Sequence, residues 1–380
     1  MNEFMRIGDI CDILNGYAFK SSKYVADGIR VIRITNVQKG FVEDTNPQYY
    51  PVSEQREIEK YMLCEGDLLM SLTGNVGRVG LLSAEMLPAA LNQRVACIRI
   101  RNPAVIYKPF LFHLLNSDYF ENKCILASQG VAQKNMSTEW LKEYPIPSFS
   151  MDKQMEIASI FDKIDDLIAR RKEQVRNMDQ AVKSRFIELF GDPVINPKGF
   201  PCYTVGEVID FQGGSQPDKK YFEYEASPDN IRLIQIRDYK SDKYITYIPK
   251  TMAKRFCTAD DIMIGRYGPP IFQILKGIEG SFNVALMKAT PKIGNREFVR
   301  QFLKQDCLLE YLEGLSKRTA GQDGIQMDKL KAYPFPYPPI ELQEQFASFV
   351  EQTDKSKLAA QKGLQELEIL KKSLMQQYFG

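Results

Sequence analysis

Histidine is almost absent from this chain of 380 residues, because His113 is the only one. Histidine is the usual residue of catalytic triads, of many metal centres and of general bases. Its near absence therefore nearly excludes those classes of site. The chain also has no P-loop motif with its phosphate-binding lysine. This argues against an ATP-driven motor within the chain.

Paired cysteines, a membrane-length apolar run and a signal peptide are missing as well. The seven cysteines are scattered along the sequence, which is typical of reduced thiols and not of a disulfide framework or a zinc site. No apolar run approaches the roughly 18 residues of a membrane helix. The N-terminus, Met1-Asn2-Glu3-Phe4, lacks the charged head and apolar core of a signal peptide. We therefore expect a cytoplasmic protein with no membrane partner.

An excess of charge of one sign is absent too, since the net charge is only +2. Residues 1–191 carry 24 basic and 24 acidic side chains, and residues 192–380 carry 26 and 24. Bulk charge therefore does not indicate a polyanionic partner. Binding to a nucleic acid would require basic residues gathered on one face.

What the chain does contain is an internal duplication, and its length fits two or three domains. At a shift of 189 residues the second half repeats the first without a gap from about residue 133 onward. Near the start of each half, Gly8-Asp9-Ile10 resembles Gly206-Glu207-Val208 at a different shift. Each half therefore has a divergent globular part and a closely matched segment of about 40 residues. The matched pairs include Tyr144–Pro147 with Tyr333–Pro336, Gln154 with Gln343, and Phe190-Gly191 with Phe379-Gly380.

The two matched segments are predicted to be long helices, since neither contains a proline. Apolar residues recur in them at heptad spacing, which is typical of a two-helix coiled coil. An ordinary core helix is the alternative, but about 40 residues make a helix of ~60 Å, longer than a small domain is wide. The predicted apolar seam comprises Ile157, Phe161, Ile164, Ile168, Val175, Met178 and Val182, and then Phe346, Val350, Leu364, Leu367 and Leu374.

Pairing of these seams within one chain requires the second helix to run antiparallel to the first. We then expect an α+β protein with two pseudo-twofold-related domains joined by the two helices. The predicted boundaries are 1–147 and 192–338 for the globular domains, and 148–191 and 339–380 for the helices. Pairing between two chains is an open alternative. Two divergent globular domains related by a twofold match a two-part DNA site, and a scaffold that binds two proteins is the alternative.

The order of motifs in each half points to one family. Each globular part contains a glycine-bearing stretch, "EGDLLMSLTGNVGRVG" at Glu65–Gly80 and "ADDIMIGRYGPPIFQI" at Ala259–Ile274. Each part closes with a polar loop and a proline-rich exit, at Ser128–Pro147 and at Arg318–Pro336. A glutamine-containing helix follows, which ends in "ELFGD" in the first half. This doubled order resembles the specificity subunit of type I restriction-modification enzymes over essentially the whole chain.

That resemblance implies two target-recognition domains, each of which reads one half of a split, asymmetric site in double-stranded DNA. The helices would set the unread gap between the halves. Methyltransferase subunits and a translocating restriction subunit would be the partners, and they would perform adenine methylation and restriction. The chain itself would then be no enzyme and would hold no cofactor, whereas S-adenosylmethionine, ATP and magnesium would bind to the partners.

Residues suited to DNA contact lie mainly in the turns and polar loops of both halves. Arginine suits guanine, and asparagine or glutamine suits adenine, while glycine-rich turns let the backbone approach phosphates. In the first half we select Tyr17, Lys20, Arg33, Asn36, Thr73, Gly74, Asn75, Arg78, Arg94, Gln129, Gln133, Lys134 and Asn135. In the second half we select Gln216, Lys219, Lys220, Gln235, Arg237, Arg266, Tyr267, Lys317, Arg318, Thr319 and Gln322.

Plainer explanations compete with these assignments. A glycine-rich turn is commonly just a hairpin, Arg33 and Arg237 suit the polar face of a strand, and Gln154 suits the first turn of a helix. A methyltransferase is disfavoured, because "YPPI" and "YGPP" lack the Asn or Asp that would orient the target amine. A nuclease built on Asp218 and Asp238-Tyr239-Lys240 is also disfavoured, because the first half has no equivalent residues.

Overall fold

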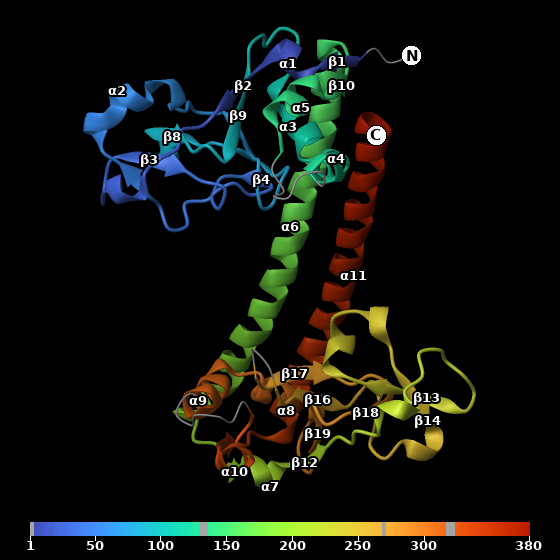
Figure 1. Ribbon diagram of the computed structural model, residues 1–380. Coiled ribbons are helices and arrows are strands. Elements are labelled where there is room, and N and C mark those ends of the chain that lie inside the picture. Colours follow the sequence, from blue (N-terminus) through green and yellow to red (C-terminus); the bar gives the residue numbers. More distant parts are fainter. Residues whose placement is uncertain (1–3, 129–135, 268–270, 317–323) are drawn as a thin grey trace. The chain divides into compact units, whose positions relative to one another are not determined.

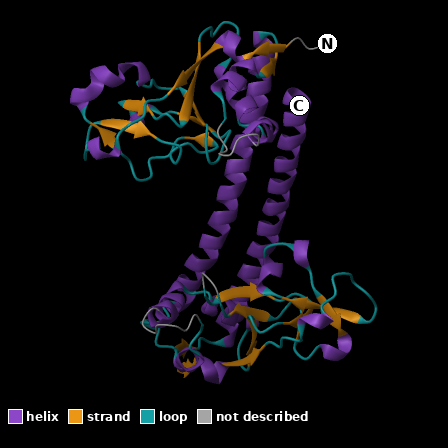
Figure 2. Cartoon of the chain, in the orientation of Figure 1, coloured by secondary structure: helices purple, strands orange, loops and turns teal. Residues whose placement is uncertain are grey.

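The computed structural model describes residues 4–128, 136–267, 271–316 and 324–380. Their contacts divide the chain into two compact units. Unit 1 is Met1–Lys172 with Gln361–Gly380, and unit 2 is Glu173–Ala360. Helices and sheets occur together in each unit (Figure 1, Figure 2), which confirms the predicted α+β class. No helix in the described ranges is long and apolar enough to cross a membrane.

Unit 1 is built on a five-stranded sheet, a three-stranded sheet and a two-stranded ribbon. Neighbouring strands are antiparallel except for the pairs β4–β7 and β3–β8. The five-stranded sheet has the order β2 (Cys11–Asn15), β9 (Val95–Ile100), β6 (Leu68–Ser71), β7 (Val79–Leu81), β4 (Gly40–Phe41). The other sheets are β5 (Tyr49–Tyr50), β3 (Ile29–Ile32), β8 (Ala89–Leu91), and β1 (Phe4–Arg6) with β10 (Pro145–Pro147). The helices are α1 (Ile7–Ile10), α2 (Gln55–Ile58), α3 (Lys108–Leu115), α4 (Asp118–Ser128) and α5 (Thr138–Glu143).

Unit 2 repeats this plan with two four-stranded sheets and a ribbon. The first sheet has the order β12 (Ile209–Gly213), β19 (Leu286–Pro291), β16 (Ile262–Gly265), β17 (Gln273–Lys276). The second is β14 (Tyr247–Pro249), β13 (Asn230–Ile234), β18 (Gly280–Phe282), β15 (Phe256–Cys257), and the ribbon is β11 (Cys202–Thr204) with β20 (Pro334–Pro336). The helices are α7 (Val205–Val208), α8 (Arg296–Leu303), α9 (Asp306–Ser316) and α10 (Met327–Ala332).

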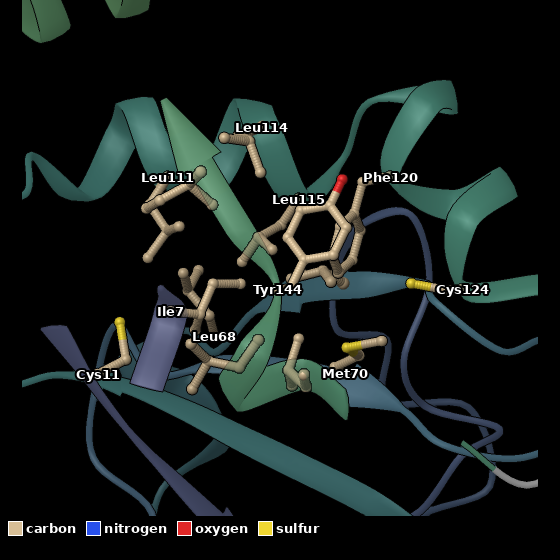
Figure 3. Close-up of a cluster of buried hydrophobic side chains, with 14 of the residues drawn as sticks. Ile7, Cys11, Leu68, Met70, Leu111, Leu114, Leu115, Phe120, Cys124 and Tyr144 are labelled. Atoms are coloured by element: carbon tan, nitrogen blue, oxygen red, sulfur yellow. The ribbon is translucent and has the colours of Figure 1, made fainter. Parts of the chain in front are cut away.

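The central strand of each unit is buried on both faces. In β6, Leu68 and Met70 join the core beneath α3 and α4, whereas Leu69 joins the core of the other sheet. Strand β16 alternates in the same way between the two cores of unit 2. This follows from the two-residue period of a strand. Figure 3 shows how apolar side chains from β6, α3 and α4 converge in unit 1.

Both long helices begin in one unit and end in the other. They are α6 (Met151–Phe190) and α11 (Ile340–Phe379), drawn green and red in Figure 1. In unit 1, Phe161 stacks on Phe379 with ring centroids 5.4 Å apart. In unit 2, Phe346 lies 5.6 Å from Phe186 and 5.4 Å from Phe190. The first part of α6 therefore packs against the end of α11, and the end of α6 packs against the first part of α11. This confirms the predicted antiparallel pair within one chain.

The predicted seam residues lie on the less exposed face of these helices. Two polar residues stand at heptad positions of the second helix, and each pairs with an acidic residue of the first, Lys371 with Asp165 and Lys357 with Asp179. Arg171, at the heptad position between Ile168 and Val175, is exposed. Buried members of the seam are Ile157, Phe161, Ile164, Val182, Phe346 and Val350. Half-buried members are Ile168, Val175, Met178, Leu364, Leu367 and Leu374.

A buried glutamine secures the first turn of each long helix. Gln154 is fully buried, and its Oε1 accepts the N–H of Tyr107 at 2.8 Å. Its Nε2 donates to the carbonyl oxygens of Val105 and Phe149, both at 2.9 Å. Gln343 repeats this arrangement in unit 2, with its Oε1 on the N–H of Asn295 at 2.8 Å. These residues are therefore buried clamps between helix and globular part, not plain first-turn residues.

Substitution of Gln154 by Ala should destabilise unit 1. Three hydrogen bonds would be lost and the buried N–H of Tyr107 would have no acceptor, at a cost of about 2–4 kcal/mol. Urea unfolding followed by circular dichroism measures this change. Gln180→Ala is the matched control, since Gln180 is exposed on the same helix. Equal stability of the two variants would contradict the clamp.

Candidate nucleic-acid interface

The strand ends of unit 1 gather several of the predicted contact residues in one place. We call residues 16–17, 33–36, 72–78 and 92–94 the loop cluster of unit 1. Backbone hydrogen bonds join its members, because Gln93 donates to the carbonyl oxygen of Tyr17 at 2.9 Å and Leu72 donates to that of Arg94 at 3.0 Å. Met136 also donates to Leu72, at 2.9 Å. The described end of the closing polar loop therefore lies beside the cluster.

Unit 2 forms the equivalent cluster from residues 213–216, 235–238, 266–267 and 283–285. Arg266 donates its backbone N–H to Ala285 at 2.9 Å, and Asn283 donates to Ile234 at 3.0 Å. A Cβ added to Gly324 would lie 3.4 Å from the Tyr267 ring. The closing loop of this unit thus also returns to its cluster.

Matching polar caps give the two clusters a similar backbone frame. In unit 1, Asn36 Oδ1 accepts the N–H of Arg33 at 3.0 Å. In unit 2, Asp238 Oδ2 accepts the N–H of Gln235 at 3.3 Å. Side chains of this type stabilise a turn by bonding to a nearby backbone amide. The frame repeats, while most side chains that it displays differ between the units.

The structure separates the predicted residues of unit 1 into exposed and internally bonded groups. Lys20, Gly74, Asn75 and Arg94 are exposed, and Thr73 is half-buried. Three others bond within the unit, as the following contacts show. Arg33 Nη2 donates to Asn46 O at 2.6 Å, Asn36 Nδ2 to Glu43 O at 3.1 Å, and Arg78 Nη1 to Gln38 Oε1 at 2.7 Å.

Asn36 needs a correction, because the structure gives it a role inside the loop. Its side chain is only 3% exposed, and both its oxygen and its nitrogen are bonded to the backbone. Removing such a buried amide from its partners would leave them unsatisfied. The residue therefore shapes the cluster and is not displayed on its surface.

Tyr17 is held by an acidic neighbour from α2. Its hydroxyl donates to the carboxylate of Glu57, and this bond raises the pKa of Tyr17 to about 12. The ring also packs against Phe19 and Tyr61, at centroid distances of 5.1 and 5.3 Å. The nearby Lys23 is likewise paired, with Glu54 at 2.8 Å. Tyr17 thus lies at the cluster with its hydroxyl already engaged.

In unit 2, Gln216, Lys219 and Lys220 are exposed. Gln235 and Arg237 both donate to the buried Thr246 Oγ1, at 3.1 and 3.0 Å. Arg266 lies with its guanidinium 5.3 Å from the exposed Tyr267 ring, a geometry suited to a cation–π contact. Lys220 is 3.6 Å from Asp218 and so is partly neutralised.

Eight predicted residues lie outside the part of the chain that the structure describes. They belong to the two closing polar loops, and their predicted contacts with DNA stay predictions. They are Gln129, Gln133, Lys134, Asn135, Lys317, Arg318, Thr319 and Gln322.

Sequence reasoning missed Gln93 and Val284, which are exposed neighbours of equivalent asparagines. The stretches "LNQRV" and "FNVAL" correspond to each other, because in each the asparagine lies three residues before the first residue of a buried strand. The residues between the asparagine and the strand differ, so this correspondence is not evident from the sequence.

The acidic residues of the alternative nuclease assignment have structural partners. Asp238 is 7% exposed and lies 3.4 Å from Arg232 Nε, and its burial raises the pKa of its carboxyl group above the usual range. Across the described residues, no group of three or more His, Cys, Asp or Glu side chains is placed to hold a metal ion. His113 is buried in unit 1, with Nε2 2.8 Å from Asp162. These residues thus serve the packing of their units.

Several known proteins are similar to this chain in sequence. The putative type I restriction enzyme MjaX specificity subunit of Methanocaldococcus jannaschii is 25% identical over 406 residues, 98% of this chain and 91% of its own length. The MjaVIII specificity subunit of that organism is 27% identical over 185 residues, 48% of this chain and 43% of its length. The EcoAI specificity subunit of Escherichia coli is 32% identical over 171 residues, 44% of this chain and 28% of its length. The chain thus spans most of the first relative and less than half of the other two.

Solved structures show the same fold over the whole chain. The type I restriction-modification S subunit of M. genitalium matches with a TM-score of 0.57 at 16% identity, over 100% of this chain and 96% of that one. A chain from a study of the assembly of a type I restriction-modification system matches with a TM-score of 0.55 at 18% identity, over 99% and 97%. The family model for the type I restriction modification DNA specificity domain matches twice, at residues 2–177 and 197–369. The chain therefore belongs to the type I restriction-modification DNA specificity family.

Proposed function

We propose that this chain is the non-catalytic, sequence-reading subunit of a type I restriction-modification complex. Unit 1 reads one half of a split, asymmetric site in double-stranded DNA, and unit 2 reads the other half. The paired helices set the unread gap. Methylation of adenine and restriction are then carried out at this site by partner subunits.

The observation that carries the proposal is the repeated backbone frame with unlike side chains. Leu72 and Arg266 make the same backbone hydrogen bond, to Arg94 and Ala285 respectively. A repeated frame supports a repeated way of approaching DNA. Unlike side chains on that frame would select unlike bases, since base-edge contacts carry the sequence information. The expected site is therefore split and asymmetric.

Basic side chains that follow the first segment of each cluster in sequence support contact with the DNA backbone. Lys20 lies at the start of the turn Ser21–Lys23, and Lys219 begins the equivalent turn Lys219–Tyr221. The side chain of neither lysine makes a hydrogen bond or an ion pair with any described residue. Exposed lysines of this kind bind phosphates without regard to sequence and add to affinity rather than to specificity.

Apolar side chains on the long helices support a protein partner. Leu167, Leu358 and Ile369 are 47%, 69% and 67% exposed on α6 and α11. Apolar side chains that face solvent on a helix are available to pack against a partner protein. We assign the exposed faces of these helices to contact with methyltransferase subunits, and we place the restriction subunit in the complete complex. S-adenosylmethionine, ATP and magnesium are assigned to those partners.

Binding of the chain with its methyltransferase partner to duplex DNA should weaken steeply as salt rises. Lys20→Ala and Lys219→Ala should each lower the slope of log K against log salt by about one, for any duplex sequence. Titrations by fluorescence anisotropy measure this slope. Lys142→Ala is the control, since Lys142 lies beside Gly8, at the opposite end of β2 from Tyr17, and pairs with Glu139. A complex that bound no duplex even at low salt would favour a protein-binding scaffold instead.

Insertion of seven residues into both α6 and α11, at facing positions, should lengthen the gap between the half-sites. Seven residues add ~10 Å to a helix and preserve the heptad phase, so the gap should grow by up to about three base pairs. Methylation sequencing measures the gap directly. Insertion into one helix alone should abolish methylation, because it separates pairs such as Lys357–Asp179. An unchanged gap in the doubly extended chain would contradict the role of the helices as a spacer.

A further inference from the structure

Each loop cluster contains a turn that several hydrogen bonds fix in place. It lies between β8 and β9 in unit 1 and between β18 and β19 in unit 2. We call Asn92–Arg94 and Asn283–Ala285 the paired turns. The asparagine is the same in both, and the two residues that follow it are different. The two turns therefore have the same backbone structure and differ only in the side chains that follow the asparagine.

The asparagine fixes the near side of each paired turn. Its backbone N–H donates to the preceding sheet, to Ile32 at 3.2 Å in unit 1 and to Ile234 at 3.0 Å in unit 2. Its Oδ1 accepts the N–H two residues on, at 3.2 Å in unit 1 and 3.1 Å in unit 2. Its carbonyl oxygen accepts the N–H of the next strand, at 2.9 and 3.0 Å. Both turns therefore have the same shape for the same reason.

A neighbouring strand end fixes the far side. The carbonyl oxygen of Arg94 accepts from Leu72 at 3.0 Å, and that of Ala285 accepts from Arg266 at 2.9 Å. Side chains that project from a backbone held this firmly are preorganised for recognition. The residues after the asparagine are therefore well placed to read a base edge.

The displayed side chains differ in chemistry. In unit 1, the side chains of Gln93 and Arg94 are exposed and make no hydrogen bond or ion pair with any described residue, so their side-chain donors are available. In unit 2, Val284 is 42% exposed and Ala285 is half-buried, so methyl groups occupy the same positions. A cation of unit 2 lies beside this turn, because Arg266, just after β16, has its Nη1 3.5 Å from Val284 O.

We propose that the paired turns determine specificity, selecting a purine in the half-site of unit 1 and a thymine in that of unit 2. Arginine and glutamine form two-pronged hydrogen bonds to guanine and adenine, whereas small apolar side chains contact the C5 methyl group of thymine. This assignment rests on the proposed function. It adds one residue pair in each unit that selects a base.

The test exchanges the two side-chain pairs in the full chain. A host that carries the chain with its methyltransferase is compared with the Q93V/R94A variant by methylation sequencing. One position of one half-site should lose its preference for a purine, with discrimination falling on the order of ten- to a hundredfold. The other half-site and the gap should not change. The reciprocal V284Q/A285R variant should remove the preference for thymine at one position of the other half-site.

Two controls separate base selection from damage to the fold. Thermal unfolding should be close to that of the natural chain for both variants, since Gln93, Arg94 and Val284 are exposed, Ala285 is only half-buried and the asparagines are retained. Lys142→Ala should leave both half-sites unchanged.

Three outcomes would overturn the assignment. They are unchanged half-sites in the variants, relaxed choice at several positions, or loss of methylation at every site by a folded variant. A natural chain that directs methylation to no split site would instead contradict the proposed function, so the two failures are distinguishable.

Discussion

Aromatic packing at the ends of the two long helices is the constraint on which the rest of the molecule depends. A solvent-exposed helix gains most of its stability from tertiary contacts, and α6 and α11 obtain them at both ends. Phe379 stacks on Phe161 and lies 5.6 Å from Phe110 of α3. Phe190 lies 4.7 Å from Phe298 of α8. Because α3 and α8 pack against the sheets, these contacts tie the helices to the frames that carry the loop clusters.

The two units use different polar groups where a buried side chain contacts a long helix. In unit 1, the buried His113 bonds to Asp162 on α6. In unit 2, the buried Arg300 bonds to Glu297 and approaches Asp354 on α11, at 2.6 and 3.4 Å. A buried polar or charged group must keep its partner, because an unpaired one is costly. The polar partners that connect a long helix to its unit can therefore differ between the units only if both partners differ together. The aromatic contacts and the buried glutamines, in contrast, occur in both units.

The duplication, the long helices and their antiparallel pairing could be predicted from the sequence, because they depend on local periodicity and on matched segments. The placement of single polar residues could not. Asn36 and Arg94 both look like polar residues next to a strand, but one is buried in its own loop and the other is exposed. The partner of Tyr17 is Glu57, forty positions along the chain. Contacts between residues so far apart in the sequence depend on tertiary folding, and the periodicity of the sequence does not predict them.

The central claim is that one chain selects one split site through two unlike units on a repeated frame. Methylation sequencing of a host that carries the chain with its partner methyltransferase, compared with the partner alone, tests it most directly. The account predicts a single asymmetric motif in two parts, separated by a gap of constant length, that disappears without the chain. A continuous or palindromic motif, or a motif that persists when the chain is removed, would contradict it.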